Sequence, residues 1–175
     1  MKSLVAFVLL SLVLNKAHCQ LSGGNCKHFV DVLPLKLREL RVTFNGIKDY
    51  FQSRDDELDI MLLNEDLLQE FKEYLGCQSV AEMIQFYLDD VFLKASNTSK
   101  SIKQHVDCVG NMLLHLRQTL KRCHRYLICE KKSKTIKNIK ETYEKLQEKG
   151  IYKAMGEFDI FINYIEEYLI LKTRK

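Results

Sequence analysis

The sequence contains a single proline and seven glycines among 175 residues. A β-sandwich or barrel needs a turn about every 8 to 12 residues, so this scarcity of chain breakers favours helices. The formal net charge is only +4, far below the basic excess typical of duplex-binding proteins, and we expect no nucleic acid partner. With 46% hydrophobic and 29% charged residues, the chain can bury the core of a single domain.

A long membrane-spanning run is also missing. Residues 4–14 form a short apolar run behind Lys2, and residues 17–19 place small side chains at the two positions that a signal peptidase reads. A membrane anchor needs roughly 18 or more apolar residues, and polar residues end this run too early. The sequence therefore predicts a signal peptide at 1–19 and a secreted, extracellular domain at 20–175 that does not insert into membranes.

Cleavage after residue 19 leaves five of the six cysteines in an oxidising compartment where disulfides persist. These are Cys26, Cys77, Cys108, Cys123 and Cys129. One cysteine is then left over, and spacing alone does not say how the others pair. Cleavage two residues earlier would retain Cys19 and allow a third bridge. We expect no metal site, because the usual CxxC pairs of zinc sites are absent.

Apolar side chains recur every three or four residues along six stretches, which is the spacing of helices with one buried face. The predicted all-α fold has helices at about 33–51, 59–75, 79–93, 101–127, 133–148 and 151–171. Gly76 and Gly150 are interpreted as left-handed caps that end the second and fifth helices. The last helix is apolar nearly all round, so we expect it to be buried from two sides.

Two polar connections carry further predictions. Asn97 begins the only N-glycosylation sequon, in a polar turn between the third and fourth helices, and is the predicted glycosylation site. Residues 130–135 are charged and lack the Gly, Pro or Asn of a tight reversal. We interpret this second segment as an extended crossover.

Four runs of sequence resemble the interleukin-10 family of class II helical cytokines. They are residues 70–78 (EFKEYLGCQ), 82–88 (EMIQFYL), 122–134 (RCHRYLICEKKSK) and 146–166 (LQEKGIYKAMGEFDIFINYIE). The match extends from about Cys26 to the C-terminus and does not distinguish a host protein from a viral one. The resemblance implies a six-helix cytokine bundle that forms an intertwined homodimer, in which the last two helices of each chain pack into the other chain's first four. A charged crossover and an all-round apolar last helix fit such an exchange.

The resemblance also implies a receptor-binding surface built from the first helix, the loop after it and the final helix. The matching residues are Arg41, Lys48, Gln52, Asp59, Lys153, Glu157 and Asp159. Charged pairs of this kind fix register and raise encounter rates at protein interfaces. Gly156 stands where the family commonly has Ser, and Asp59 follows what looks like a one-residue insertion, so these two contacts depart from the family pattern.

In this family pattern Cys26 pairs with Cys123 and Cys77 with Cys129, which leaves Cys108 as a buried inert thiol or an exposed one liable to cross-link. A disulfide-bonded Cys123 is no nucleophile, so His124 beside it does not make a catalytic dyad. The sequence also lacks a Gly-rich phosphate loop, an HExxH motif and a GxSxG motif. We expect neither an enzyme nor a cofactor.

The sequence thus predicts a secreted cytokine that binds and clusters class II cytokine receptors, the interleukin-10 receptor chains, with anti-inflammatory signalling. A non-signalling receptor decoy would have the same sequence features. A secreted helical lipid-binding protein is the alternative from a different class, because such carriers also use disulfides and apolar helix faces. A basic cluster could attract sulfated glycosaminoglycans. It consists of Lys121, Arg122, His124, Arg125, Lys131, Lys132 and Lys134.

Overall fold

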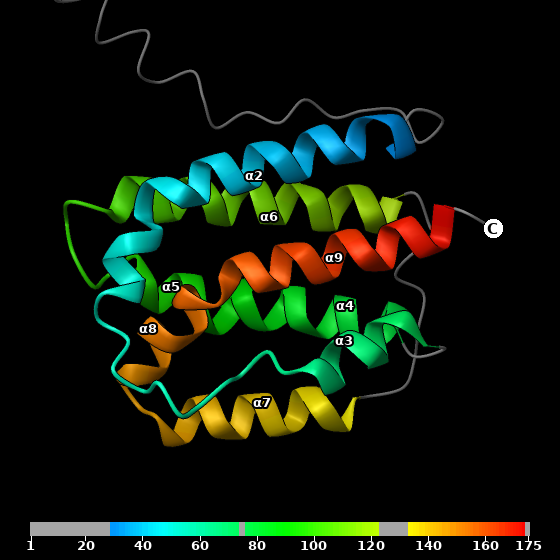
Figure 1. Cartoon of the computed structure of the whole chain (residues 1–175). Coiled ribbons are helices and arrows are strands. Elements are labelled where there is room, and N and C mark those ends of the chain that lie inside the picture. Colours follow the sequence, from blue (N-terminus) through cyan, green and yellow to red (C-terminus); the bar gives the residue numbers. More distant parts are fainter. Residues whose placement is uncertain (1–28, 74–75, 123–132, 174–175) are drawn as a thin grey trace, which may run out of the picture.

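The computed structural model describes residues 29–73, 76–122 and 133–173, and these residues form helices joined by turns, as predicted (Figure 1). The elements are α2 (Phe29–Gln52), α3 (Glu65–Lys72), α4 (Gly76–Phe86), the π-helical turn η2 (Tyr87–Val91), α5 (Phe92–Ala95), α6 (Lys103–Arg122), α7 (Lys134–Lys145), α8 (Lys149–Gly156) and α9 (Phe158–Thr173). The predicted all-α fold is confirmed. Within the described part of the chain, no helix is long and apolar enough to cross a membrane.

Helix α9 occupies the middle of the bundle. It contacts α2 on one side and α3 and α4 on the other, while α6 packs beside α2 (Figure 1). Phe158, Phe161 and Ile162 are fully buried, as expected for an enclosed helix. The predicted second apolar face is less enclosed than expected, since Leu171 is 37% exposed. The core therefore forms around one broad face of α9.

Helices α7 to α9 pack in this single chain against α2 to α5 of the same polypeptide. The start of α7 is fixed by Ser133, whose side chain accepts a hydrogen bond from the Ile136 N–H and whose own N–H donates to Glu82. The rest of the predicted crossover, before Ser133, lies outside the described residues. The same helix contacts could form within one chain or between two exchanged chains, so the intertwined dimer stays a prediction.

Two predicted helix boundaries are wrong. They are far apart in the sequence but close together in space. The second helix does not begin near residue 59 but at Glu65, where the Asn64 side chain accepts a hydrogen bond from the Leu67 N–H in the manner of an N-cap. The last predicted helix is interrupted at Glu157, which separates α8 from α9. The apolar periodicity continues through both places, so it gives no sign of either break.

The predicted left-handed caps at Gly76 and Gly150 are also wrong. No glycine in the described ranges has a positive φ, and Gln147 adopts one instead, with φ 52°. A Cβ atom on Gly76 would lie 2.0 Å from the Phe71 carbonyl oxygen, and one on Gly150 would lie 2.6 Å from the Tyr143 carbonyl oxygen. Both glycines therefore permit close approach of two backbone segments rather than a special backbone angle.

The expectation that Cys108 is an unpaired thiol is wrong as well. Cys77 and Cys108 are both disulfide-bonded. The expectation rested on the family pattern, whose two disulfides leave Cys108 over. Cys26, Cys123 and Cys129 lie outside the described residues, so the two predicted pairs stay predictions.

Candidate functional site

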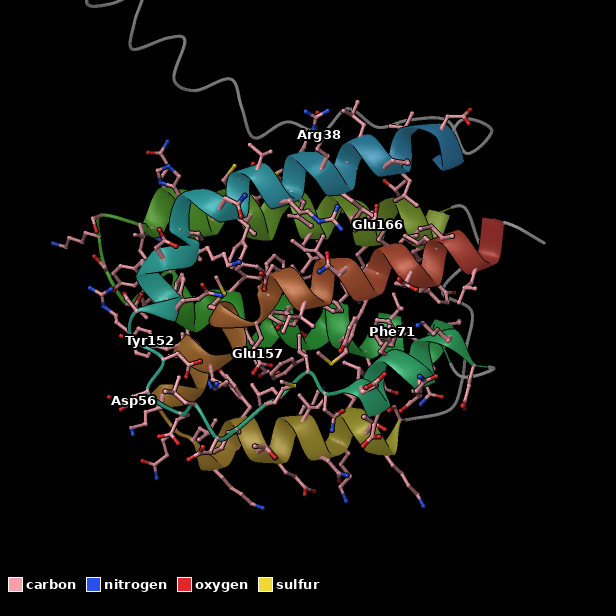
Figure 2. The ribbon with its side chains drawn as sticks, viewed as in Figure 1. Arg38, Asp56, Phe71, Tyr152, Glu157 and Glu166 are labelled. Atoms are coloured by element: carbon pink, nitrogen blue, oxygen red, sulfur yellow. The ribbon has the colours of Figure 1, made fainter. Side chains whose placement is uncertain are left out.

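Helix α2 runs beside α9, and polar side chains link the two helices along their length. Arg41 donates hydrogen bonds to Asn163, at 3.0 Å, and to Glu166, which lies on the side of α9 that faces α2 (Figure 2). Farther along α2, the Lys48 ammonium lies 2.6 Å from the Asp159 carboxylate. Both members of this second pair are about one third exposed, with relative side-chain exposures of 29% and 32%. We call this row of polar contacts between α2 and α9 the seam. It presents charges of both signs to solvent.

The seam ends at the corner between α8 and α9. The Gln52 side-chain amide donates to the Gly156 carbonyl oxygen at 3.0 Å. A Cβ atom on Gly156 would lie 3.6 Å from the Asp55 carboxylate and 3.7 Å from Gln52, which are ordinary contacts. The position therefore has room for a Cβ atom, so close packing does not require glycine here.

A buried ion pair lies directly beneath this corner. The Lys153 ammonium is 2.7 Å from the Asp55 carboxylate and 3.8 Å from that of Glu157. The three side chains are only 6%, 13% and 10% exposed. Lys153 and Glu157, which were predicted to bind a receptor, are thus largely buried within this chain, and their receptor contacts stay a prediction.

The Glu157 carboxylate accepts hydrogen bonds from two consecutive backbone N–H groups. The shortest distances are 3.1 Å to the Leu62 nitrogen and 2.8 Å to the Leu63 nitrogen. Burial raises the pKa of the Glu157 carboxyl above its usual value, although these N–H groups and Lys153 oppose the rise and Asp55 adds to it. The bonded donors favour the ionised carboxylate inside surroundings that disfavour a charge.

The segment between α2 and α3 runs past this corner (Figure 2), and the two together line an open cleft of about 480 Å³. The lining residues are Gln52, Asp55, Leu58, Asp59, Ile60, Met61, Lys153, Gly156, Glu157, Asp159 and Ile160. Leu58 is 85% exposed and Met61 is 63% exposed, so two large apolar side chains are accessible together at this cleft. Exposed apolar groups next to partly exposed charges suit a protein partner.

The structure brings together six of the seven predicted receptor-binding residues at or beside the cleft, namely Lys48, Gln52, Asp59, Lys153, Glu157 and Asp159. Arg41 lies farther along the seam, beside Glu166. Sequence reasoning missed Asp55, Leu58 and Met61. The sequence did carry one unused signal. Lys149, Lys153 and Glu157 are spaced by four residues, which indicates that their side chains share one helix face.

Two other predictions fall largely outside the site. Asn97 is exposed just after α5, and its side-chain amide donates to the Leu93 carbonyl oxygen at 3.0 Å. Its glycosylation stays a prediction. In the basic cluster, Lys121 and Lys134 are exposed at the ends of α6 and α7. The cluster members within 123–132 lie outside the described residues.

Within the described ranges, no group of His, Cys, Asp and Glu side chains is arranged to hold a metal ion. The residues that line the cleft offer hydrogen bonding, ion pairing and apolar contact. These are the interactions of a docking surface.

A family model described as Interleukin 10 matches residues 2–171. Interleukin-10 of Gallus gallus is 60% identical over 168 residues, which cover 96% of this chain and 95% of that protein. Interleukin-10 of Felis catus is 56% identical over 154 residues, with 88% and 86% covered, and that of Cervus elaphus is 54% identical over 153 residues, with 87% and 85% covered.

Proposed function

Because this chain belongs to the interleukin-10 family, whose members are cytokines and not enzymes, we propose that it is secreted and that it binds and clusters class II cytokine receptor chains. The expected outcome is immunoregulatory, anti-inflammatory signalling. The observation that carries the proposal is the cleft between α2 and the α8–α9 corner, where Leu58 and Met61 stand exposed beside charged side chains.

This cleft combines the two kinds of contact that make a receptor interface. Leu58 and Met61 supply apolar area that a partner can cover, and a few well-packed residues carry most of the binding energy at an interface. The partly exposed Lys48–Asp159 pair supplies charges that orient a partner and raise the association rate. The alternative of a lipid carrier has less support, because the apolar faces of α2, α5 and α9 pack on one another in the described part of the chain.

Asp159→Lys is expected to weaken binding to an immobilised interleukin-10 receptor ectodomain by about 2 kcal/mol, roughly thirtyfold in Kd. The substitution reverses a charge at the rim of the cleft and places two cations together at Lys48. Surface plasmon resonance measures the affinity, and circular dichroism checks that the helix content is unchanged.

The matched control for this substitution is Asp107→Lys. Asp107 also forms a partly exposed ion pair, at 3.1 Å to Lys103, but on α6 and outside the cleft. We expect the control to bind as the unaltered protein does. Equal affinity of all three proteins would remove Asp159 from the site.

We also propose that two chains exchange helices α7 to α9 to form a homodimer. The charged segment before α7 lacks turn residues, and the contacts of α7 to α9 with α2 to α5 would join the two chains if exchanged. A two-fold dimer carries two copies of the cleft, so it gathers two sets of receptor chains. This arrangement provides a mechanism for clustering.

Inserting about six Gly and Ser residues after Lys132 should convert the dimer into monomers, because a longer linker lets α7 to α9 fold back on their own chain. Sedimentation velocity measures the change in mass. The same insertion after Lys100, between α5 and α6, should leave the dimer intact. Dimers that persist with the longer linker at 132 would count against the exchange.

A further inference from the structure

The segment between α2 and α3 is contacted along most of its length by side chains from one side of α8 and from the start of α9. Lys149, Lys153 and Glu157 are spaced by four residues, so they project from the same side of the helix. We name the residues between the two helices, 53–64, the presenting segment. Each of these three side chains contacts a different part of it.

The first half of the presenting segment is held by cations. Lys149 lies 3.1 Å from the Asp56 carboxylate and 2.6 Å from that of Glu57. Lys153 lies 2.7 Å from Asp55, in a buried position. The exposed pairs of Lys149 are worth little by themselves, whereas the buried pair of Lys153 fixes where the segment leaves α2.

The second half is held by the carboxylate of Glu157 and by Tyr164. The Leu62 and Leu63 N–H groups both donate to Glu157, and the Tyr164 hydroxyl lies 3.2 Å from the carbonyl oxygens of Leu63 and Asn64. Leu62 and Leu63 are 3% and 1% exposed. Buried backbone N–H groups need an acceptor, and Glu157 supplies it from a residue more than ninety positions away, since the sequence separation is 94 for Leu63.

We propose that Glu157 is a positioning residue. It fixes Leu62 and Leu63, and so presents Leu58, Asp59 and Met61 to the receptor. The inference deepens the receptor-binding function proposed above and rests on it. Glu157 is 8% exposed, and its carboxylate accepts hydrogen bonds from both backbone N–H groups and is faced by Lys153, so its contacts within the chain hold the segment.

An ordered presenting segment matters because ordering a segment at the moment of binding costs free energy. When Glu157 holds the segment beforehand, the exposed apolar side chains of Leu58 and Met61 already stand in the geometry of the cleft. Without the carboxylate, the segment samples more conformations and the receptor selects a minor population. The expected loss is therefore in the association rate as well as in affinity.

The test combines amide hydrogen exchange with receptor binding for three variants. In Glu157→Ala, the Leu62 and Leu63 amides should exchange about 100-fold faster or more, while amides in the middle of α9 keep their protection. Affinity for an immobilised interleukin-10 receptor ectodomain should fall about 10- to 100-fold. Glu157→Gln retains one acceptor oxygen and should be intermediate in both measurements, and it carries the test if the alanine variant does not fold. Glu167→Gln, which alters an exposed carboxylate on α9, is the control and should change neither.

Each outcome decides the inference. Faster exchange together with weaker binding supports it, and unchanged exchange at Leu62 and Leu63 overturns it. Lost affinity with intact protection would mean that Glu157 contacts the receptor directly. Lost protection with intact affinity would mean that the presenting segment needs no fixing. The exchange measurement uses no receptor, so failure of the proposed function would be separately visible, as absence of binding by the unaltered protein.

Discussion

Lys153→Met is expected to lower the free energy of unfolding by about 3 to 5 kcal/mol, because it removes one partner of a buried ion pair. The Lys153 side chain is 6% exposed and lies 2.7 Å from Asp55, which is itself only 13% exposed. Methionine fills a similar volume, so the loss reports the missing charge rather than a cavity. Denaturant unfolding at one fixed protein concentration measures the change, since association would also contribute to stability.

Two further variants separate this explanation from a general sensitivity of α8. Lys149→Met, one turn earlier on the same helix face, removes a cation that is 54% exposed and should change stability little. Adding Asp55→Asn to Lys153→Met removes the carboxylate that would otherwise be left buried and unpaired, so the double variant should recover much of the lost stability. A Lys153→Met protein as stable as the unaltered one would show that the pair contributes nothing to the fold.

The consequence for the site is direct. Lys153 and Glu157 were predicted as receptor contacts from the resemblance, which carries residue types from one sequence to another and says nothing about their depth. The structure shows them beneath the surface, where they hold the presenting segment. If the proposed positioning role holds, substitutions at such positions are expected to weaken binding through the shape of the cleft, so a loss of affinity alone would not identify a contact.

Most helices of the fold were predictable because local periodicity reports a buried face. In α2, the apolar positions at spacings of three and four are all buried in the structure, as with Leu37, Phe44 and Phe51, which are at most 1% exposed. The pattern depends only on residues within one helix. Tertiary contacts do not need to be known for such a prediction to succeed.

The two misplaced helix boundaries, at the start of the second helix and within the last one, arise from tertiary contacts and not from local periodicity. Leu62 and Leu63 are apolar and buried, as helical residues would be, yet their N–H groups bond to Glu157 instead of to a preceding turn. The interruption of the last helix falls at the same Glu157. This interaction joins residues far apart in the sequence, and no local pattern encodes it. The glycines at 76 and 150 were misread for the same reason, because a close approach depends on a neighbour that spacing does not reveal.

Phe158→Ala should destabilise the fold by about 3 to 5 kcal/mol, since it removes a large aromatic side chain from a fully buried site. Phe158 has no exposed surface, and its ring packs edge-to-face against rings from three other elements. The centroid distances are 5.0 Å to Phe44 of α2, 5.0 Å to Tyr87 of η2 and 5.1 Å to Phe92 of α5. Such aromatic pairs add to the free energy of area burial.

The position of Phe158 ties this core to the site, because it is the residue between Glu157 and Asp159. Loss of the ring leaves a cavity at the start of α9, and partial collapse there should move both neighbours, so receptor affinity should fall along with stability. Phe158→Leu keeps part of the volume and should lose less of each, whereas Leu93→Ala, at a side chain 65% exposed on α5, should change neither. Thermal unfolding and receptor binding measured on the same three proteins test the link. If Phe158→Ala lost stability but bound the receptor with full affinity, the geometry of the α8–α9 corner would not depend on this aromatic anchor.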